Sequence, residues 1–590
     1  MRTSKIVFLP LLMALTSGSI LNAAVPANNA SAKKTISSAA KPSPLMDAMT
    51  AEMERALAAL QKSAQESQPA PYYMSILARD TTRLDVVAQH GALMASSQNH
   101  QRGADITVRI GDWTVDNTHG AHRTSALHTI ELPLEDNRPA IARSLWHGIN
   151  AGYTTALQSY LKVKSELAVH AKEEDTSADF SKQPAVQAAQ PPIPAPALDR
   201  VAWEARARAL SAVFRAHPKI LTDMVVLSAN TDNDTYVSSE GSRLTHPAQS
   251  YRIVVLATTR ADDGMDIGLV RTFEGRGEQD LPAKSELEKQ VGELATQLDT
   301  LRTAPAAEPF DGPALLSGRA SAVFFHEVLG HRLEGQRQRG SQEGETFTKD
   351  VDKPILPAFL SVADDPTLES YAGVHLNGYY AFDEEGQPAQ RVELVDRGVL
   401  RRFLMSRMPI THFDSSNGHG RAQAGRMPTG RQGNLIVTAA TTVSDEKLRS
   451  MLLDEVKKQN KPYGLYFADI ASGYTLTQRV SPQAFQVVPQ LVYRVYADGR
   501  PDELVRGVNI VGTPQASLMR IEAAGDKPAV FNGECGAESG SVPVSAAAPA
   551  LLFSVIETQK AAQGNTRPPI LPSPGDNTAP IKIVTVQEAR

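Results

Sequence analysis

Apolar residues recur at helical spacing near the start of the chain, after Ser43 as an N-cap and Pro44 in the first turn. The stripe consists of Leu45, Met49, Met53, Leu57 and Leu60. Alternating apolar and polar residues at 72–77, 84–88 and 106–110 then predict strands of an antiparallel sheet. A second helical stripe, from Ile141 to Leu157, predicts a long helix. The first unit is therefore predicted as helix, strands, helix.

The same order of elements recurs between residues 199 and 298. The pattern predicts a helix over 199–215, a helix from Leu287 to Leu298 and, between them, strands near 221–229, 234–238, 250–259 and 266–273. We therefore predict an N-terminal α/β domain over 43–304 with an internal duplication. Residues 171–198, rich in Ala, Pro and Gln, are predicted as an insertion or linker.

The pattern changes after residue 304. We predict that a helix begins at Asp311-Gly312-Pro313, and that short antiparallel strands separated by Gly-rich turns follow as far as residue 557. This indicates a C-terminal β-rich antiparallel domain over 305–560 that carries the helix, followed by a Pro-rich tail over 561–590. The predicted fold class is α+β.

The first residues have the features of a targeting signal. Arg2 and Lys5 precede and border a short apolar run over 6–15, and a small-residue cleavage zone ends at Ala24. We predict a signal peptide over 1–24 and a disordered segment over 25–42. The alternative is a membrane anchor, but the run is short for a bilayer, and no later stretch suits a stable membrane span. The expected location is periplasmic or secreted.

Charge and cysteine content narrow the function further. The net charge is −5 with both signs interspersed, which argues against a nucleic-acid partner. Cys535 is the only cysteine. Because cysteines of exported proteins usually pair as disulfides, a lone thiol indicates an intermolecular disulfide, a buried inert group or a metal ligand.

One short string contains residues suited to metal chemistry: His326-Glu327-Val328-Leu329-Gly330-His331. In the H-E-x-x-H motif two histidines four apart share one helix face, whereas here the second histidine is five residues on. Five steps of an ideal helix leave the two side chains about 140° apart. One metal can bind both only if the helix ends, widens or kinks between them, and we expect Gly330 to permit that.

The string alone is compatible with a surface helix carrying two ordinary histidines or with a buried metal site. Phe324 and Phe325 precede it and favour burial, and a buried His–Glu pair needs partners that a metal supplies. Zinc accepts imidazole and thiolate, and a catalytic zinc keeps three protein ligands and one open position. Cys535 lies in 532–536, which we predict as a tight turn able to point its thiol inward.

Several segments, in order, resemble the TldD/PmbA metallopeptidases, once called modulators of DNA gyrase. The similar segments are Tyr236–Gly241, His326–His331, Leu333–Gly335, Asp383–Gly386, Asn417–Arg421, Arg426–Thr429, Cys535–Gly536 and Ser541–Val544. The resemblance covers most of the chain after the signal and is strongest over 311–557. The signal peptide, the 171–198 insertion and the Pro-rich tail depart from the familiar members, which puts the family's intracellular roles in doubt for this chain.

The resemblance implies a zinc metallopeptidase with an N-terminal α/β domain and a C-terminal β-rich domain. On that basis His326, His331 and Cys535 hold Zn²⁺, and Glu327 activates the zinc-bound water. The resemblance also implies unfolded or short peptides as substrate, and a homodimer or a heterodimer with a related subunit.

Two alternatives to a peptidase are open: a catalytically silent zinc-containing binding or partner subunit, and an exported metal-binding or assembly protein. Glu327 favours the peptidase, because a structural zinc site needs no base. We predict that His419, Arg421 and Arg426 contact substrate, and Arg431 is also suited to a peptide carboxylate or backbone. The alternatives are a fourth zinc ligand for His419 and a solvated basic loop for the arginines.

Overall fold

The computed structural model describes residues 43–120, 125–169, 175–196, 198–339, 344–479 and 484–561, with residues 569, 571 and 574. The predicted signal peptide, the predicted disordered segment and most of the predicted tail lie outside these residues. Within the described parts of the chain, no helix is both long and apolar enough to cross a membrane.

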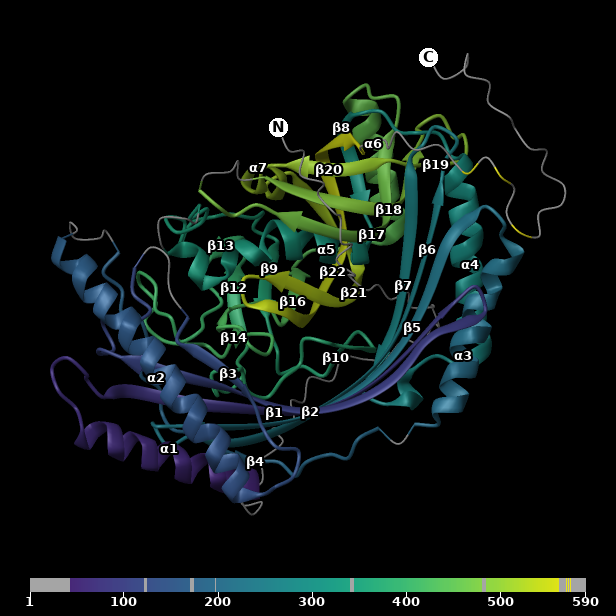
Figure 1. Ribbon diagram of the computed structural model, residues 1–590. Coiled ribbons are helices and arrows are strands. Elements are labelled where there is room, and N and C mark those ends of the chain that lie inside the picture. Colours follow the sequence, from purple (N-terminus) through teal and green to yellow (C-terminus); the bar gives the residue numbers. More distant parts are fainter. Residues whose placement is uncertain are drawn as a thin grey trace, which may run out of the picture.

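Two helix–strand–helix units share one curved sheet (Figure 1). The first unit contains α1 (Pro44–Lys62), β1 (Pro71–Gln89), β2 (Ala92–Ile110), β3 (Leu127–Glu131) and α2 (Arg138–Val169). The second contains α3 (Arg200–Ala212), β5 (Ile220–Ser238), β6 (Arg243–Arg260), β7 (Asp266–Gly275) and α4 (Lys284–Thr303). The strand order is β3-β2-β1-β5-β6, and both β7 and β4 (Gln187–Ala189) pair with β6. This order of elements is the duplication predicted from the sequence.

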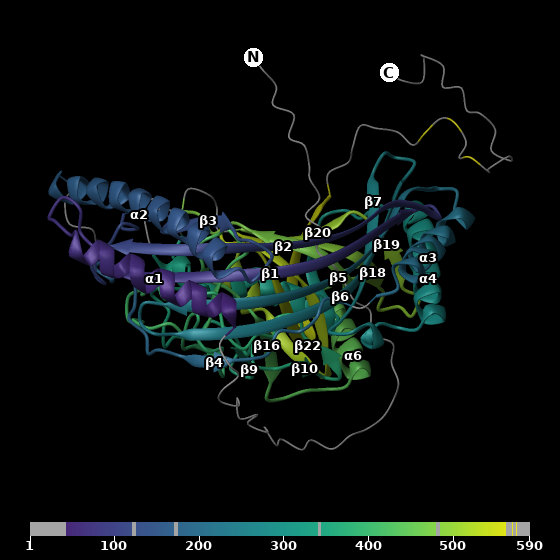
Figure 2. The ribbon, with the colours of Figure 1, turned by 60° about the horizontal axis from the view of Figure 1, so that its bottom comes forward.

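The two units meet where β1 pairs antiparallel with β5, from Ser75 opposite Ser238 to Ala88 opposite Val225. Even-numbered residues of β1 pack in the two helix-covered cores, with Ile76 in the core that contains α1 and α2, and Val86 in the core that contains α3 and α4. Because alternate residues of a strand share one face, all four helices cover the same face of the sheet. Figure 2 shows the long strands running between the two helix pairs. The opposite face receives the C-terminal half, for example where Leu77 and Phe382 share a small core.

The C-terminal half is built on an 11-stranded sheet. Its strands are β8 (Phe310–Leu316), β9 (Leu360–Asp364), β12 (Val392–Asp396), β13 (Val399–Leu400), β16 (Asn434–Ala439), β17 (Gly464–Thr475), β18 (Phe485–Val495), β19 (Glu503–Val505), β20 (Val508–Gly512), β21 (Ile521–Ala537) and β22 (Gly540–Lys560). Short pairs β10 (Ser370–Tyr371) with β11 (Val374–His375) and β14 (Gly420–Arg421) with β15 (Thr429–Gly430) lie outside it. Most pairings are antiparallel, and β8 pairs with both β17 and β22, so that β22-β20-β18-β17-β8 closes into a ring.

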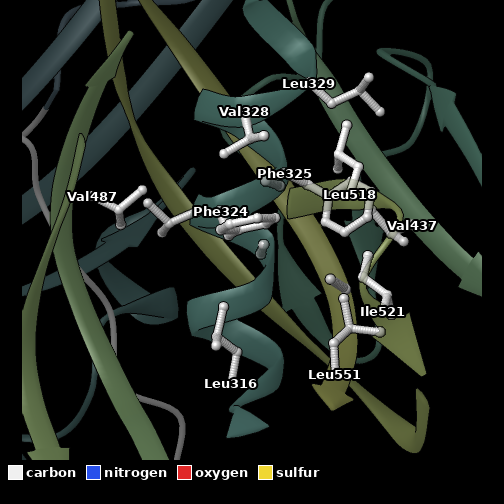
Figure 3. Close-up of a cluster of buried hydrophobic side chains, with 14 of the residues drawn as sticks. Leu316, Phe324, Phe325, Val328, Leu329, Val437, Val487, Leu518, Ile521 and Leu551 are labelled. Atoms are coloured by element: carbon white, nitrogen blue, oxygen red, sulfur yellow. The ribbon is translucent and has the colours of Figure 1, made fainter. Parts of the chain in front are cut away.

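The helix α5 (Gly318–Val328) lies in the core of this half. Two further helices, α6 (Asp445–Lys458) and the short α7 (Pro514–Leu518), follow later in the chain. Every residue of α5 except Arg319 is buried, as expected for a helix that is covered on all sides. Figure 3 shows Phe324 and Phe325 among Val487, Leu518 and Leu551. The α+β fold class is therefore confirmed, while the limits of the two domains stay predictions.

The helix start predicted at residues 311–313 is wrong, because these residues lie in β8. Phe310, Ala314 and Leu316 are buried between strands on both sides of β8, and this burial outweighs the local signal of Gly312-Pro313. The helix instead begins after Ser317, whose side chain accepts a hydrogen bond from the Ala320 N–H.

The segment predicted as an insertion or linker packs closely where it is described. In residues 175–196, Phe180 is 3% exposed, the Ser181 N–H donates to the Arg407 carbonyl, and β4 adds a parallel strand to β6. This segment therefore connects the first sheet to the C-terminal half.

Candidate metal centre

His326 and His331 come from two consecutive helical turns of different type. α5 ends at Val328, and the 3₁₀ helix η3 (Gly330–Leu333) carries His331. The change between them, at Leu329, brings the two imidazole centroids to 4.9 Å with the rings 75° apart. The irregularity expected between the histidines is present.

The break depends on Arg332 and on clearance at Gly330. Arg332 donates from Nη1 to the carbonyls of Glu327 and Val328, which the end of the helix leaves without helical partners. Gly330 does not adopt a left-handed conformation, so its role differs from the backbone freedom that the sequence suggested. A β-carbon there would come within 2.0 Å of Gln432 Oε1, so glycine is required for this close approach.

Cys535 reaches the histidines from β21. The predicted tight turn at 532–536 is wrong: these residues pair with β22, where Cys535 lies opposite Val542, and the reversal of the chain follows Ala537. Cys535 Sγ is 3.3 Å from His331 Nε2. One ligand atom from each of His326, His331 and Cys535 lies within 4.8 Å of the others, and all three residues are buried.

These residues fit a bound zinc ion. Neither ring nitrogen of His326 has a hydrogen-bond partner among the described residues, and the same holds for Glu327 Oε1. Buried polar atoms rarely lack partners, so such a cluster needs a ligand or ion. Two imidazoles and one thiolate are a donor set that zinc accepts in catalytic sites.

The charges around the cluster favour a thiolate. Burial alone would raise the pKa of Cys535, but His331, His326 and Arg431 together hold that pKa well below its ordinary value. Burial likewise opposes the charged form of His331, yet Cys535 and Glu334 raise its pKa well above the usual range. Since the thiolate is the form that binds metals, the local field prepares Cys535 as a ligand.

Glu327 lies beside the three ligands without joining them. Its Oε2 is 3.9 Å from His331 Nε2, and only 1% of the residue is exposed. Burial raises the pKa of this carboxyl group, and the charges of His326 and His331 lower it in part. A carboxylate with a raised pKa next to a metal site is suited to general-base chemistry.

The predicted substrate residues occupy different environments. His419 is fully buried, with Nε2 3.3 Å from Asp364 Oδ1 and Nδ1 3.0 Å from the Asn417 carbonyl. Arg421 is buried and donates to the carbonyls of Gln432 and Pro543, whereas Arg426 is exposed. Their contact with a substrate stays a prediction.

Three further residues contact the ligands: Glu334 and Gln432, which were assigned no role from the sequence, and Arg431, which was assigned one toward substrate. Glu334 contacts His331 Nδ1 at 3.1 Å, Arg431 donates to the Cys535 carbonyl at 2.6 Å, and Gln432 donates to the His326 carbonyl. The three-residue spacing of Glu334 from His331 is a local signal that could have indicated this contact. The contacts of Arg431 and Gln432 join residues more than 100 positions apart, which no local pattern reveals.

A buried His, His, Cys cluster with an adjacent carboxylate is an arrangement that can hold a catalytic metal ion. Residues 311–560 match the family described as the PmbA/TldA metallopeptidase C-terminal domain. Residues 311–560, which are less than half of the chain, are therefore similar to the C-terminal domain of that family.

Sequence relatives carry similar descriptions. A metalloprotease of Methanothermobacter thermautotrophicus is 25% identical over 378 residues, which cover 62% of this chain and 74% of the relative. A metalloprotease TldD homologue of Haemophilus influenzae is 26% identical over 41% of this chain and 47% of its own length. A metalloprotease of Archaeoglobus fulgidus is 26% identical over 45% of this chain and 57% of its own length. The chain thus spans about half the length of these last two relatives.

Solved structures share the fold at low identity. TldE of Thermococcus kodakarensis aligns with a TM-score of 0.56 and 11% identity, over 86% of this chain and 100% of that one. A protein of Thermotoga maritima described as a putative modulator of DNA gyrase aligns with a TM-score of 0.55 and 15% identity. The alignment covers 86% of this chain and 100% of that one.

Proposed function

We propose that this protein is a zinc-dependent metallopeptidase that hydrolyses unfolded or short peptides outside the cytoplasm. The observation that carries the proposal is the meeting of His326, His331 and Cys535 with Glu327, whose Oε1 has no partner among the described residues. The metalloprotease names of the relatives support it.

A zinc ion held by the three ligands would supply Lewis acidity toward a peptide carbonyl and a water molecule. Glu327 would take a proton from the attacking water and pass it to the leaving amine. Its raised pKa makes the carboxylate a stronger base toward the attacking water. The surrounding protein excludes bulk solvent, which strengthens these electrostatic interactions.

Burial of the centre supports unfolded or short peptides as the substrate class. His326, Glu327 and Cys535 are each 1% exposed, so a rigid folded surface cannot reach them. An extended segment can enter a narrow space and can also pair its backbone with a strand edge, which holds the scissile bond in place.

A dimer belongs to the proposal as well. The similarity to TldE supports a partner subunit of the same family, which would be a second copy of this chain or a related one. The location outside the cytoplasm rests on the predicted signal peptide, and N-terminal sequencing of the exported protein should give a first residue near Val25.

The test is a metal assay on the purified protein combined with a peptide-library cleavage assay, applied to the parent and to Glu327→Gln. The parent should bind one zinc per chain and cleave unfolded peptides. Glu327→Gln should keep its zinc and lose about 10²–10⁴ in rate. Glu522→Gln, an exposed change in the same strand as Cys535, is the control and should match the parent. Cleavage by Glu327→Gln at the parent's rate would favour the silent partner subunit instead.

A further inference from the structure

Two of the three candidate ligands, His331 and Cys535, belong to a closed ring of polar contacts with Glu334 and Arg431. Cys535 Sγ is 3.3 Å from His331 Nε2, and His331 Nδ1 is 3.1 Å from Glu334 Oε1. The same Glu334 oxygen is 3.4 Å from Arg431 Nε, and Arg431 Nη2 donates at 2.6 Å to the Cys535 carbonyl. The ring therefore returns to the cysteine from which it started.

The two outer members of the ring have no contact with solvent. The side chains of Glu334 and Arg431 are both 0% exposed. A second arginine, Arg337, donates from Nε to the other oxygen of Glu334 at 2.9 Å. Because removal of water from charged groups is costly, a wholly buried carboxylate held between two guanidinium groups needs a reason beyond stability.

Glu334 determines which ring nitrogen of His331 is available to a metal. An ionised carboxylate only accepts hydrogen bonds, so the ring must donate from Nδ1 to Glu334. With Nδ1 engaged by Glu334, Nε2 is the nitrogen that faces Cys535 Sγ and is placed to bind a metal. The contact thus fixes the orientation of the ring.

Arg431 fixes the position of Cys535 through the backbone of the β21–β22 hairpin. Its Nη1 donates to Ser539 Oγ at 2.8 Å and to the Gly540 carbonyl at 3.0 Å, while Nη2 holds the Cys535 carbonyl. The planar fork of a guanidinium can hold these acceptors together, which the single ammonium of lysine cannot do. Arg431 thereby ties the strand that carries the thiol to the carboxylate that orients the histidine.

We propose that Glu334 and Arg431 are positioning residues that hold His331 and Cys535 in metal-binding geometry and so determine the zinc affinity of the centre. The inference rests on the metal site of the proposed function, but not on peptide hydrolysis. Groups that orient metal ligands from behind typically change metal affinity by about 10–100-fold when they are altered.

The test measures zinc affinity by chelator competition on the full chain, together with the visible spectrum of the cobalt-substituted protein. Glu334→Asp keeps the charge between the two arginines but shortens the reach to His331. Glu334→Gln keeps the length and removes the charge. Both should weaken zinc binding by about 10–100-fold and shift the cobalt bands, which report ligand geometry. Two variants are used so that a folding defect in one does not decide the result.

Glu538→Gln is the matched control, because Glu538 also pairs with Arg337, at 3.0 Å, but is 44% exposed and is not a member of the ring. Its zinc affinity and cobalt spectrum should equal those of the parent. Arg431→Lys should weaken zinc binding by at least about tenfold, whereas the exposed Arg426→Lys on the neighbouring loop should not. Melting temperatures of the metal-free proteins distinguish positioning from general stability: a positioning role lowers mainly the increase in melting temperature that zinc produces.

Parent-like zinc affinity and cobalt spectra in Glu334→Asp, Glu334→Gln and Arg431→Lys would overturn the inference. A drop in metal-free stability with unchanged zinc affinity would do so too, by assigning these residues a structural role only. A parent that binds zinc through this ring but cleaves no peptide would instead refute the proposed function and leave the inference standing. A parent that binds no metal would refute both.

Discussion

Gly473 of β17 lies directly against the side chain of Glu327. A β-carbon at residue 473 would come within 2.5 Å of Glu327 Cγ and 3.0 Å of its Cδ. Atoms at such separations overlap, and the 1% exposure of Glu327 leaves its carboxylate little room to move aside. The absence of a side chain at 473 is therefore a condition for the position of the proposed base.

Gly473→Ala should consequently impair catalysis without removing the metal. The added methyl group should displace the Glu327 carboxylate, and a displacement of about 1 Å can cost about 10² in rate. We expect kcat/KM for an unfolded peptide to fall at least about tenfold, with zinc content unchanged because no ligand is touched. Gly292→Ala is the control, since no heavy atom outside the neighbouring backbone of its own helix lies within 4 Å of the added carbon there. Equal activity of Gly473→Ala and the parent would show that Glu327 is not held by this contact.

Cys535→Ser should lose most of the bound zinc. A serine hydroxyl stays protonated near neutrality, whereas a metal-bound thiol is deprotonated and contributes strongly to affinity. The two histidines alone should bind zinc at least about tenfold more weakly. Zinc bound to the parent should also slow the reaction of Cys535 with a thiol reagent. Unchanged zinc affinity in the serine variant would remove Cys535 from the ligand set.

Local signals predicted the parts of this fold that local contacts determine. Ser43 caps α1 as expected, because its side chain bonds the Met46 N–H only three residues away. The duplicated order of helices and strands also followed from hydrophobic periodicity. In contrast, Gly312-Pro313 suggested a helix start where burial between β17 and β22 produces a strand.

The candidate site divides in the same way. His326, Glu327 and His331 lie within six residues, so the sequence was sufficient to single them out. The break between the histidines was also expected, but the sequence attributed it to the flexibility of Gly330. The structure attributes it to Arg332 and to the packing of Gln432, which is 102 positions further along the chain. Contacts of that separation leave no periodic trace in one sequence.

The approach of Gln432 to Gly330 gives a paired prediction. Gly330→Ala alone should disturb the break and lower zinc affinity, since the new β-carbon would meet Gln432 Oε1 at 2.0 Å. Shortening the neighbour in Gly330→Ala/Gln432→Ser should restore much of that affinity. We expect a coupling of about 1–3 kcal/mol between the two positions in a double-mutant cycle of zinc binding. Simple additivity would contradict the steric explanation.

Phe180 gives a prediction for stability. Its ring lies between two guanidinium groups, with Arg109 Cζ 3.8 Å and Arg407 Cζ 4.1 Å from its centroid, and it stacks on Trp113. Phe180→Ala should therefore lower the free energy of unfolding by about 3–5 kcal/mol. Leu167→Ala, an exposed apolar change on α2, should cost less than about 0.5 kcal/mol. Denaturant unfolding of both variants measures the difference, and similar values would show that the 175–196 segment contributes little.

Glu274 should make the stability of the protein depend on pH. Burial raises its pKa from 4.5 to about 7, although Arg252, 3.1 Å away, lowers it in part. The folded state therefore holds this proton more tightly than the unfolded state, and the resulting stability is complete below the unfolded pKa of 4.5. It is lost as the pH rises toward 7, and the loss amounts to roughly 3 kcal/mol.

Glu274→Gln removes this titration, so its free energy of unfolding should fall less between pH 4.5 and 8 than that of the parent. Urea unfolding at several pH values measures both slopes, with the exposed Glu522→Gln as control. If Glu274→Gln and the parent lose stability in parallel over this range, the Glu274 carboxyl group does not titrate there.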